Sequence, residues 1–141
     1  MKYAITLIVL VILAYFFIPK SSSTPSFEDN INLANAFNSR DVKQLKKVIE
    51  DGYPKDFINP VDGNSLLHMS VNICDIEYVK YVLSLNLDPN IKNNESKKAI
   101  DIAKERSKST ITYSDGRTKE VDSPYADIYR ALKQYQSTYK K

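Results

Sequence analysis

The sequence predicts an all-α fold: a solenoid of about three helix-turn-helix repeats with one inserted β-hairpin, preceded by a hydrophobic N-terminal helix. Three observations lead to this prediction. Residues 3–18 form an apolar run without a charged side chain. Apolar residues then recur at helical spacing in several later segments. Two similar segments, beginning at Asp62 and Glu95, lie thirty-three residues apart, which is typical of a repeat protein.

The N-terminal run is expected to contact a membrane. As a helix, residues 3–18 would span roughly 24 Å, which is shorter than the about 20 residues of a usual transmembrane span. Lys2 supplies the positive charge that precedes an export signal. We interpret residues 1–20 as a signal anchor, with a cleaved signal peptide as the alternative, and residues 21–26 as a spacer. The anchored domain would face the periplasm or the cell exterior; secretion after cleavage and a cytoplasm-facing adaptor are the other arrangements.

Two later segments each predict a helix with one apolar face. Apolar side chains follow helical spacing in residues 42–49 and again in residues 76–83. A pair of such helices cannot bury its apolar face alone, and stacking about three pairs gives one continuous core. We therefore expect a single repeat domain over residues 27–139.

The middle segment resembles an ankyrin repeat over its full length. Asp62 and Gly63 begin a turn, and the sequence SLLH at residues 65–68 stands where this family has its T-P-L-H motif. The sequence LDPN at residues 87–90 is similar to the A-D-P-N exit loop, and ESKKAIDIA at residues 95–103 is similar to the start of a last repeat. The resemblance implies repeats at about 28–61, 62–94 and 95–135.

This sequence departs from the ankyrin pattern at two positions. Leu66 replaces the usual proline of the T-P-L-H motif, and Asn86 replaces the usual glycine after the second helix. Asparagine is the next best residue for a left-handed helix end, so the expected geometry survives.

An insertion interrupts the last repeat. Residues 110–113 and 118–121 are rich in strand-forming residues, and Asp115-Gly116 between them is a strong turn signal. We expect a β-hairpin at about residues 110–121; a disordered insertion within residues 107–121 is the alternative. Ser123 and Pro124 then predict the start of the last helix.

The sequence contains no recognisable catalytic, cofactor or metal site. His68 and Cys74 are the only histidine and the only cysteine, and no phosphate-binding glycine loop, zinc spacing or calcium loop occurs. The part after Lys20 carries eighteen basic against seventeen acidic residues, a balance that argues against nucleic-acid binding. We expect no enzyme, no cofactor and no bound metal. His68 is expected to join neighbouring turns by hydrogen bonds, as the resemblance implies.

Partner binding is the function that the resemblance implies. Ankyrin domains bind other proteins through their turn tips and the first helix of each repeat. Carried over by position, this gives the following residues in the second and third repeats: Gly63, Asn64, Leu66, Cys74, Asp75, Ser96, Lys97 and Ala99. Leu66 is expected to be an exposed apolar anchor. The hairpin adds Tyr113, Asp115 and Arg117 as a mixed aromatic and charged tip.

The combination of an export segment with a binding domain suggests two functions. The first is an immunity or inhibitor protein that binds a secreted toxin or effector. The alternative is a structural scaffold or adaptor of a cell-envelope complex. In both cases the partner is another protein, and residues 3–18 provide the contact with the membrane.

Overall fold

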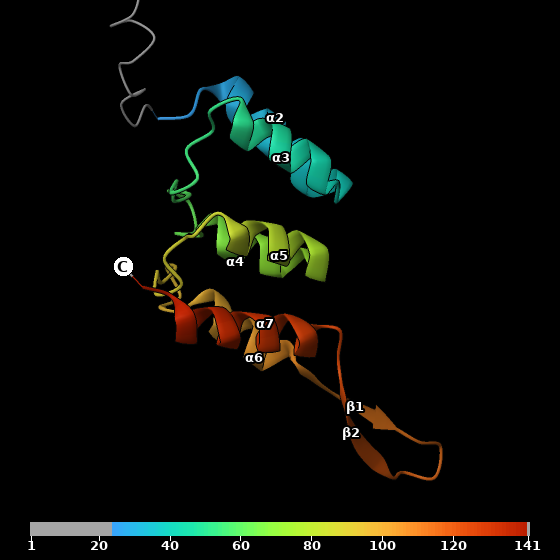
Figure 1. Cartoon of the computed structure of the whole chain (residues 1–141). Helices are drawn as coiled ribbons and strands as arrows, with labels where there is room; N and C mark the ends of the chain where they lie inside the picture. Colours follow the sequence, from blue (N-terminus) through green and yellow to red (C-terminus); the bar gives the residue numbers. More distant parts are fainter. Residues whose placement is uncertain (1–23, 141) are drawn as a thin grey trace, which may run out of the picture.

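The computed structural model describes residues 24–140, which form six helices and one two-stranded sheet. The helices pack as three pairs in one stack, with the hairpin projecting from its last pair (Figure 1). The elements are α2 (Phe27–Ser39), α3 (Val42–Glu50), α4 (Leu66–Ile73), α5 (Ile76–Ser84), α6 (Ala99–Arg106), β1 (Lys108–Thr112), β2 (Thr118–Asp122) and α7 (Tyr125–Thr138).

The predicted N-terminal membrane segment, residues 3–18, lies outside the described residues. Between residues 24 and 140, no helix is both long and apolar enough to cross a membrane.

Polar caps fix where the helices begin. Ser26 accepts a hydrogen bond from the backbone N–H of Asp29, whose carboxylate accepts one from the Ser26 N–H in return. Asp41 and Asp75 begin the second helices of the first two repeats by accepting from backbone N–H groups two residues later, at 2.8 and 2.9 Å. These caps satisfy N–H groups that have no partner within the helix.

Left-handed residues fix where the helices end. Arg40 and Cys74 adopt φ values of 54° and 60° directly after α2 and α4. Asn86 follows α5 with a φ of 56°, which confirms the left-handed conformation expected for this asparagine. Gly52 occupies the matching place after α3. Equivalent positions in the first and second repeats are therefore thirty-four residues apart. This offset is one residue longer than the offset between the second and third repeats.

The core runs without interruption through all three helix pairs. Its fully buried members include Leu45 of the first repeat, Tyr78 and Val79 of the second, and Ile128 and Leu132 of the third. The hydroxyl of Tyr135 donates to the Leu87 carbonyl at 2.7 Å and ties α7 to the loop after α5. The three pairs bury a shared surface that none could bury alone.

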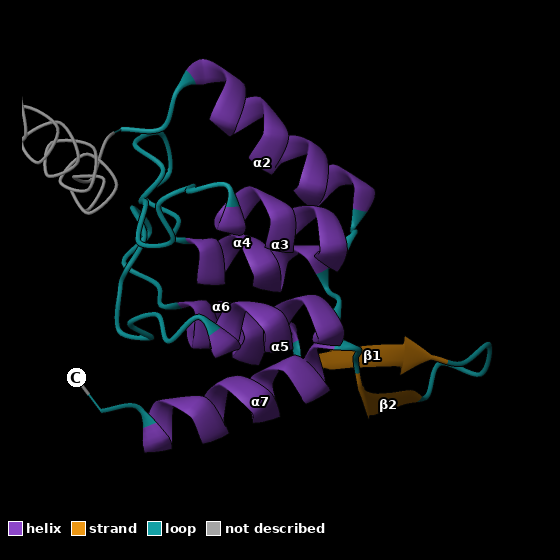
Figure 2. Cartoon of the chain, turned by 45° about the horizontal axis from the view of Figure 1, so that its top comes forward, coloured by secondary structure: helices purple, strands orange, loops and turns teal. Residues whose placement is uncertain are grey.

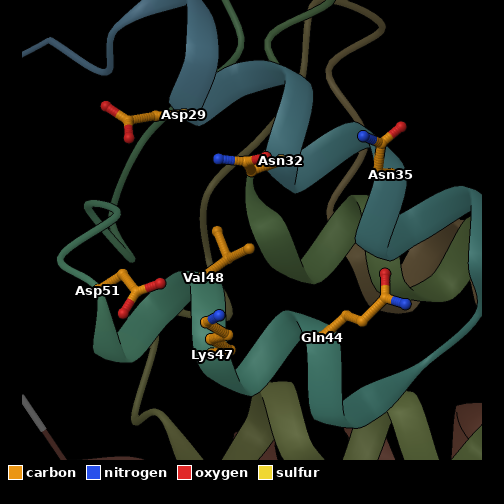
Figure 3. A pocket seen from close by; sticks show the side chains of 7 residues that line it. All are labelled: Asp29, Asn32, Asn35, Gln44, Lys47, Val48 and Asp51. Carbon is orange, nitrogen blue, oxygen red and sulfur yellow. The ribbon is translucent and has the colours of Figure 1, made fainter.

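The outer face of the first repeat is polar. Asn32 and Asn35 of α2 and Gln44 and Lys47 of α3 line an open groove of about 280 Å³ on this face (Figure 3). At the matching offset the second repeat carries Leu66, Met69, Tyr78 and Tyr81, which face the first repeat or border its core. The first repeat therefore has the polar outer face of a capping repeat, which favours contact with solvent over packing against another helix pair.

The hairpin is ordered and confirms the predicted two strands. The strand β1 begins two residues earlier than expected, since Lys108 pairs with Asp122 in the register and forms a 2.9 Å ion pair with it. The helix α7 begins at Tyr125, one residue later than expected, although Ser123 accepts a hydrogen bond from the Tyr125 N–H at 3.2 Å. The hairpin and α6 are joined where the Ser123 N–H donates to the Ser107 carbonyl at 2.9 Å.

Tyr78 is the one residue of the described core whose side-chain polar atom is buried without a hydrogen-bond partner. Its burial, together with the carboxylates of Asp41 and Asp75, raises its pKa far above the usual value. We expect Tyr78→Phe to raise the free energy of unfolding by about 1 kcal/mol, because the unpaired hydroxyl is removed. Urea denaturation measures the change.

Tyr53 provides the matched control for this prediction. Its hydroxyl donates to Asn30 at 3.0 Å, and burial and Asp29 raise its pKa to about 12. Tyr53→Phe should lower the free energy of unfolding by about 1 kcal/mol, since it removes the hydrogen bond that the buried Tyr53 side chain makes with Asn30. Equal losses in the two variants would contradict the assignment of the Tyr78 hydroxyl as unpaired.

Candidate partner-binding surfaces

The turn between α3 and α4 contains Gly63 and Asn64, two of the predicted binding residues. Gly63 has a φ of 71°, and a Cβ atom there would lie 2.5 Å from Asn94 Oδ1 and 2.8 Å from its backbone nitrogen. The Asn64 amide donates to Asp62 at 2.7 Å and its oxygen accepts from Asn93 at 3.1 Å. Both residues therefore hold two successive turns together, and their role in partner binding stays a prediction.

The next turn presents Ser96 and Lys97. Ser96 is exposed and has a φ of 61°, in the place that Gly63 occupies one repeat earlier. Lys97 forms ion pairs with Glu95 at 3.5 Å and Glu105 at 2.8 Å, and these carboxylates raise the pKa of its amine. Their accessible side chains keep both residues available to a partner.

The expected exposure of Leu66 is wrong. Its side chain is only 1 % exposed, because the first turn of α4 packs directly beneath the first repeat. Ala99, at the same place in the third repeat, is buried for the same reason. Asp75 and Cys74 are half-buried, and the Asp75 carboxylate caps α5 by accepting from two backbone N–H groups. Leu66 is therefore a core residue of the interface between repeats.

The structure brings Tyr113, Asp115 and Arg117 together at the hairpin tip. The Arg117 guanidinium pairs with the Asp115 carboxylate at 2.7 Å and lies 5.8 Å from the centre of the Tyr113 ring. The Gly116 N–H donates to the Tyr113 carbonyl at 2.9 Å, and Gly116 takes the positive φ of 82° that closes the turn. These contacts hold an aromatic ring and a cation in a fixed arrangement far from the stack.

The two faces of the hairpin differ in chemistry. One face carries Lys108, Glu120 and Asp122. Lys108 forms ion pairs with both carboxylates, and Asp122 also forms one with Arg130 of α7 at 2.9 Å. Lys108 and, less strongly, Arg130 hold the pKa of Asp122 below its usual value. This face is therefore tied to the last helix.

The opposite face of the hairpin carries Ile111, Tyr113, Arg117, Lys119 and Val121. The strand register places these side chains together. Ile111 pairs with Lys119, and side chains two positions further along each strand lie on the same face. We call these five residues the outer hairpin face. Ile111 and Tyr113 are 46 % and 45 % exposed. Ile111 and Lys119 were not predicted as binding residues. Side chains alternate between the two faces of a strand, so this alternation would have placed both residues on the same face as Tyr113 and Arg117.

His68 has the expected bridging role. Its Nε2 donates to the Lys97 carbonyl at 2.9 Å, while Nδ1 accepts from the backbone N–H and the hydroxyl of Ser65 at 3.3 and 2.8 Å. The side chain is 1 % exposed, and burial lowers its pKa. Within residues 24–140, no group of three histidine, cysteine or acidic side chains could hold a metal ion.

Comparisons with known proteins identify the fold. No protein-family profile matches the chain. The crystal structure of the ankyrin domain of Osh1 from Kluyveromyces lactis superimposes with a TM-score of 0.55 at 18% sequence identity. The match covers 78% of this chain and 39% of the Osh1 chain, so this chain spans well under half of that structure. The helix pairs, the linked turns and this superposition together show that the chain has an ankyrin-repeat fold.

Proposed function

We propose that this chain binds another protein while residues 3–18 hold it at a membrane, and that it acts by binding and not by catalysis. The finer proposal is an immunity or inhibitor role, in which it covers a secreted toxin or effector. The domain would lie in the periplasm or outside the cell, either anchored or released after signal cleavage.

The outer hairpin face is the observation that carries the proposal. The hairpin does not belong to the repeat core, and all residues from Lys108 to Glu120 are exposed. Its outer face combines apolar Ile111 with aromatic Tyr113 and two cations, Arg117 and Lys119. Tyrosine and arginine are enriched among the residues that dominate binding energy at protein interfaces. A partner with an acidic, partly apolar surface would complement this face.

A photocrosslinking experiment in the source organism tests this proposal. A photoreactive phenylalanine analogue replaces Tyr113 in the full-length protein, and the same analogue at Asn35 on the outer face of the first repeat is the control. We expect the Tyr113 variant to capture one exported protein and the Asn35 variant to capture none. Deletion of the gene should then make the cells sensitive to that exported protein.

Binding of the captured partner can be measured with purified proteins. Tyr113→Ala should weaken binding by at least about 2 kcal/mol, roughly thirtyfold, if the ring is a dominant contact. Thr110→Ala, on the opposite hairpin face, should change binding little. Equal crosslinking from Tyr113 and Asn35, or no effect of Tyr113→Ala, would refute the assignment. A constant complex with a resident envelope protein, without toxin sensitivity on deletion, would instead support the scaffold alternative.

A further inference from the structure

Exposed apolar side chains lie on α2 and on the loop before α4. Six large apolar residues are exposed among residues 24–140, and four of them belong to these two segments. Phe27 and Val61 are 83 % and 84 % exposed, and Ile31 and Ile58 are 43 % and 38 % exposed. Single exposed apolar residues are common, but these two segments carry four of the six. We call these four residues the apolar edge.

Contacts between α2 and the loop bring the two segments together. The Tyr53 hydroxyl donates to Asn30 at 3.0 Å across the gap between them. A largely apolar cavity of about 360 Å³ lies there, lined on the α2 side by Leu33 and Ala34 and on the loop side by Phe57 and Pro60. Phe27, Ile31 and Ala34 follow helical spacing, so the exposed residues of α2 continue the helix face that borders this cavity.

The chain before α2 restricts where the apolar edge can lie. Five residues separate Ile18, the end of the apolar run at residues 3–18, from Thr24, the first described residue. Even fully extended, the six steps from Ile18 to Thr24 reach about 20 Å. When residues 3–18 lie in a membrane, Thr24, three residues before α2, therefore lies within about 20 Å of residue 18, because the connecting chain reaches no farther.

The opposite edge of the stack carries the hairpin. The start of α2 and the loops between the helix pairs lie along one edge of the stack, and β1 and β2 project beyond the other (Figures 1 and 2). Placing the loop edge of the first repeat against the membrane directs the hairpin away from it. The tether and the proposed partner surface then occupy opposite edges, and binding of one does not hinder the other.

We propose that the apolar edge lies in the interface of the lipid bilayer, with Phe27 and Val61 inserted among the headgroups. This inference rests on the membrane tether that is part of the proposed function. The tether raises the effective concentration of the domain at the surface, so a few apolar side chains suffice for contact. Interfacial apolar groups typically enter roughly 5–10 Å into the headgroup and acyl boundary. The bilayer thereby fixes the orientation of the domain.

Single tryptophan reporters test this placement, because the chain contains no tryptophan of its own. The full chain is reconstituted into phosphatidylcholine vesicles, with and without lipid that is brominated near the headgroup end of its acyl chains. Phe27→Trp and Val61→Trp report on the apolar edge. Tyr113→Trp on the hairpin is the negative control, and Phe16→Trp in the proposed anchor is the positive control.

We expect brominated lipid to quench the Phe27→Trp and Val61→Trp emission and plain lipid to shift it to shorter wavelength, as for Phe16→Trp. The emission of Tyr113→Trp should be neither shifted by plain lipid nor quenched by brominated lipid. Quenching of Phe16→Trp alone would overturn the apolar edge as a membrane contact and leave that surface to a protein partner, while the tether would stand. An unquenched Phe16→Trp reporter in a chain that does not float with the vesicles would overturn the tether itself, and the membrane contact with it.

Discussion

Replacing Leu66 with asparagine is expected to lower the free energy of unfolding by about 4 kcal/mol, since an amide without a partner takes the place of a buried apolar side chain. Leu66 is 1 % exposed and lies in the first turn of α4, where that helix meets the first repeat. A small domain is stable by only about 5–15 kcal/mol. Urea denaturation followed by circular dichroism should therefore show a transition at much lower denaturant.

The matched control is Asn32→Leu, at the corresponding place in the first repeat. Asn32 is exposed and lines the polar groove on the outer face of the stack. Because no helix within residues 24–140 covers this face, the free energy of unfolding should change by no more than about 0.5 kcal/mol. The interpretation of Leu66 as a core residue between repeats fails if both variants lose similar stability.

Replacing His68 should have the second largest effect, a loss of about 3 kcal/mol for His68→Asn. The imidazole makes three hydrogen bonds, two to Ser65 within its own repeat and one to the Lys97 carbonyl of the next. Asparagine is too short to span both partners, so the third repeat should lose one of its hydrogen bonds to the second. Hydrogen exchange should then show faster opening of α6 and α7 than of α4.

The same histidine makes stability depend on pH in a defined direction. Burial lowers its pKa in the folded protein, and protonation at Nδ1 would place a proton against the Ser65 N–H that this nitrogen accepts. A folded pKa below the unfolded value of about 6.5 means that the stabilisation is complete above that pH and is lost as pH falls through the folded pKa. Since His68 is the only histidine, the free energy of unfolding should fall as the pH drops below about 6.5.

The His68→Asn variant is also the control for this pH dependence. Its free energy of unfolding should be nearly constant from about pH 6.5 to 5, because the remaining side chains titrate mainly outside this interval. Wild-type stability that stays constant or rises on acidification from pH 6.5 to 5 would contradict the lowered pKa of His68.

The candidate binding residues show which surface properties local sequence can predict. Tyr113, Asp115 and Arg117 meet at the hairpin tip because a turn signal between two strands fixes neighbours only a few residues apart. Gly63 and Asn64 lie at a turn as the repeat pattern implies, but their contacts reach Asn94 and Asn93, thirty or so residues later. Such contacts belong to the stacking of turns, and no short pattern specifies them.

Local residue preferences explain where the helices begin and end and where the hairpin turns. Asp75 as a cap, Asn86 in the left-handed region and Gly116 in the hairpin turn all follow from the preferences of single residues within one turn of chain. Which sides of those helices are buried depends instead on packing between repeats. Leu66 and Asn32 occupy equivalent places in two repeats, yet Leu66 is buried and Asn32 is exposed, because the first repeat covers Leu66 and no helix within residues 24–140 covers Asn32. The same reason separates the apolar edge from the core: burial depends on which neighbour covers a face, and that neighbour is distant in sequence.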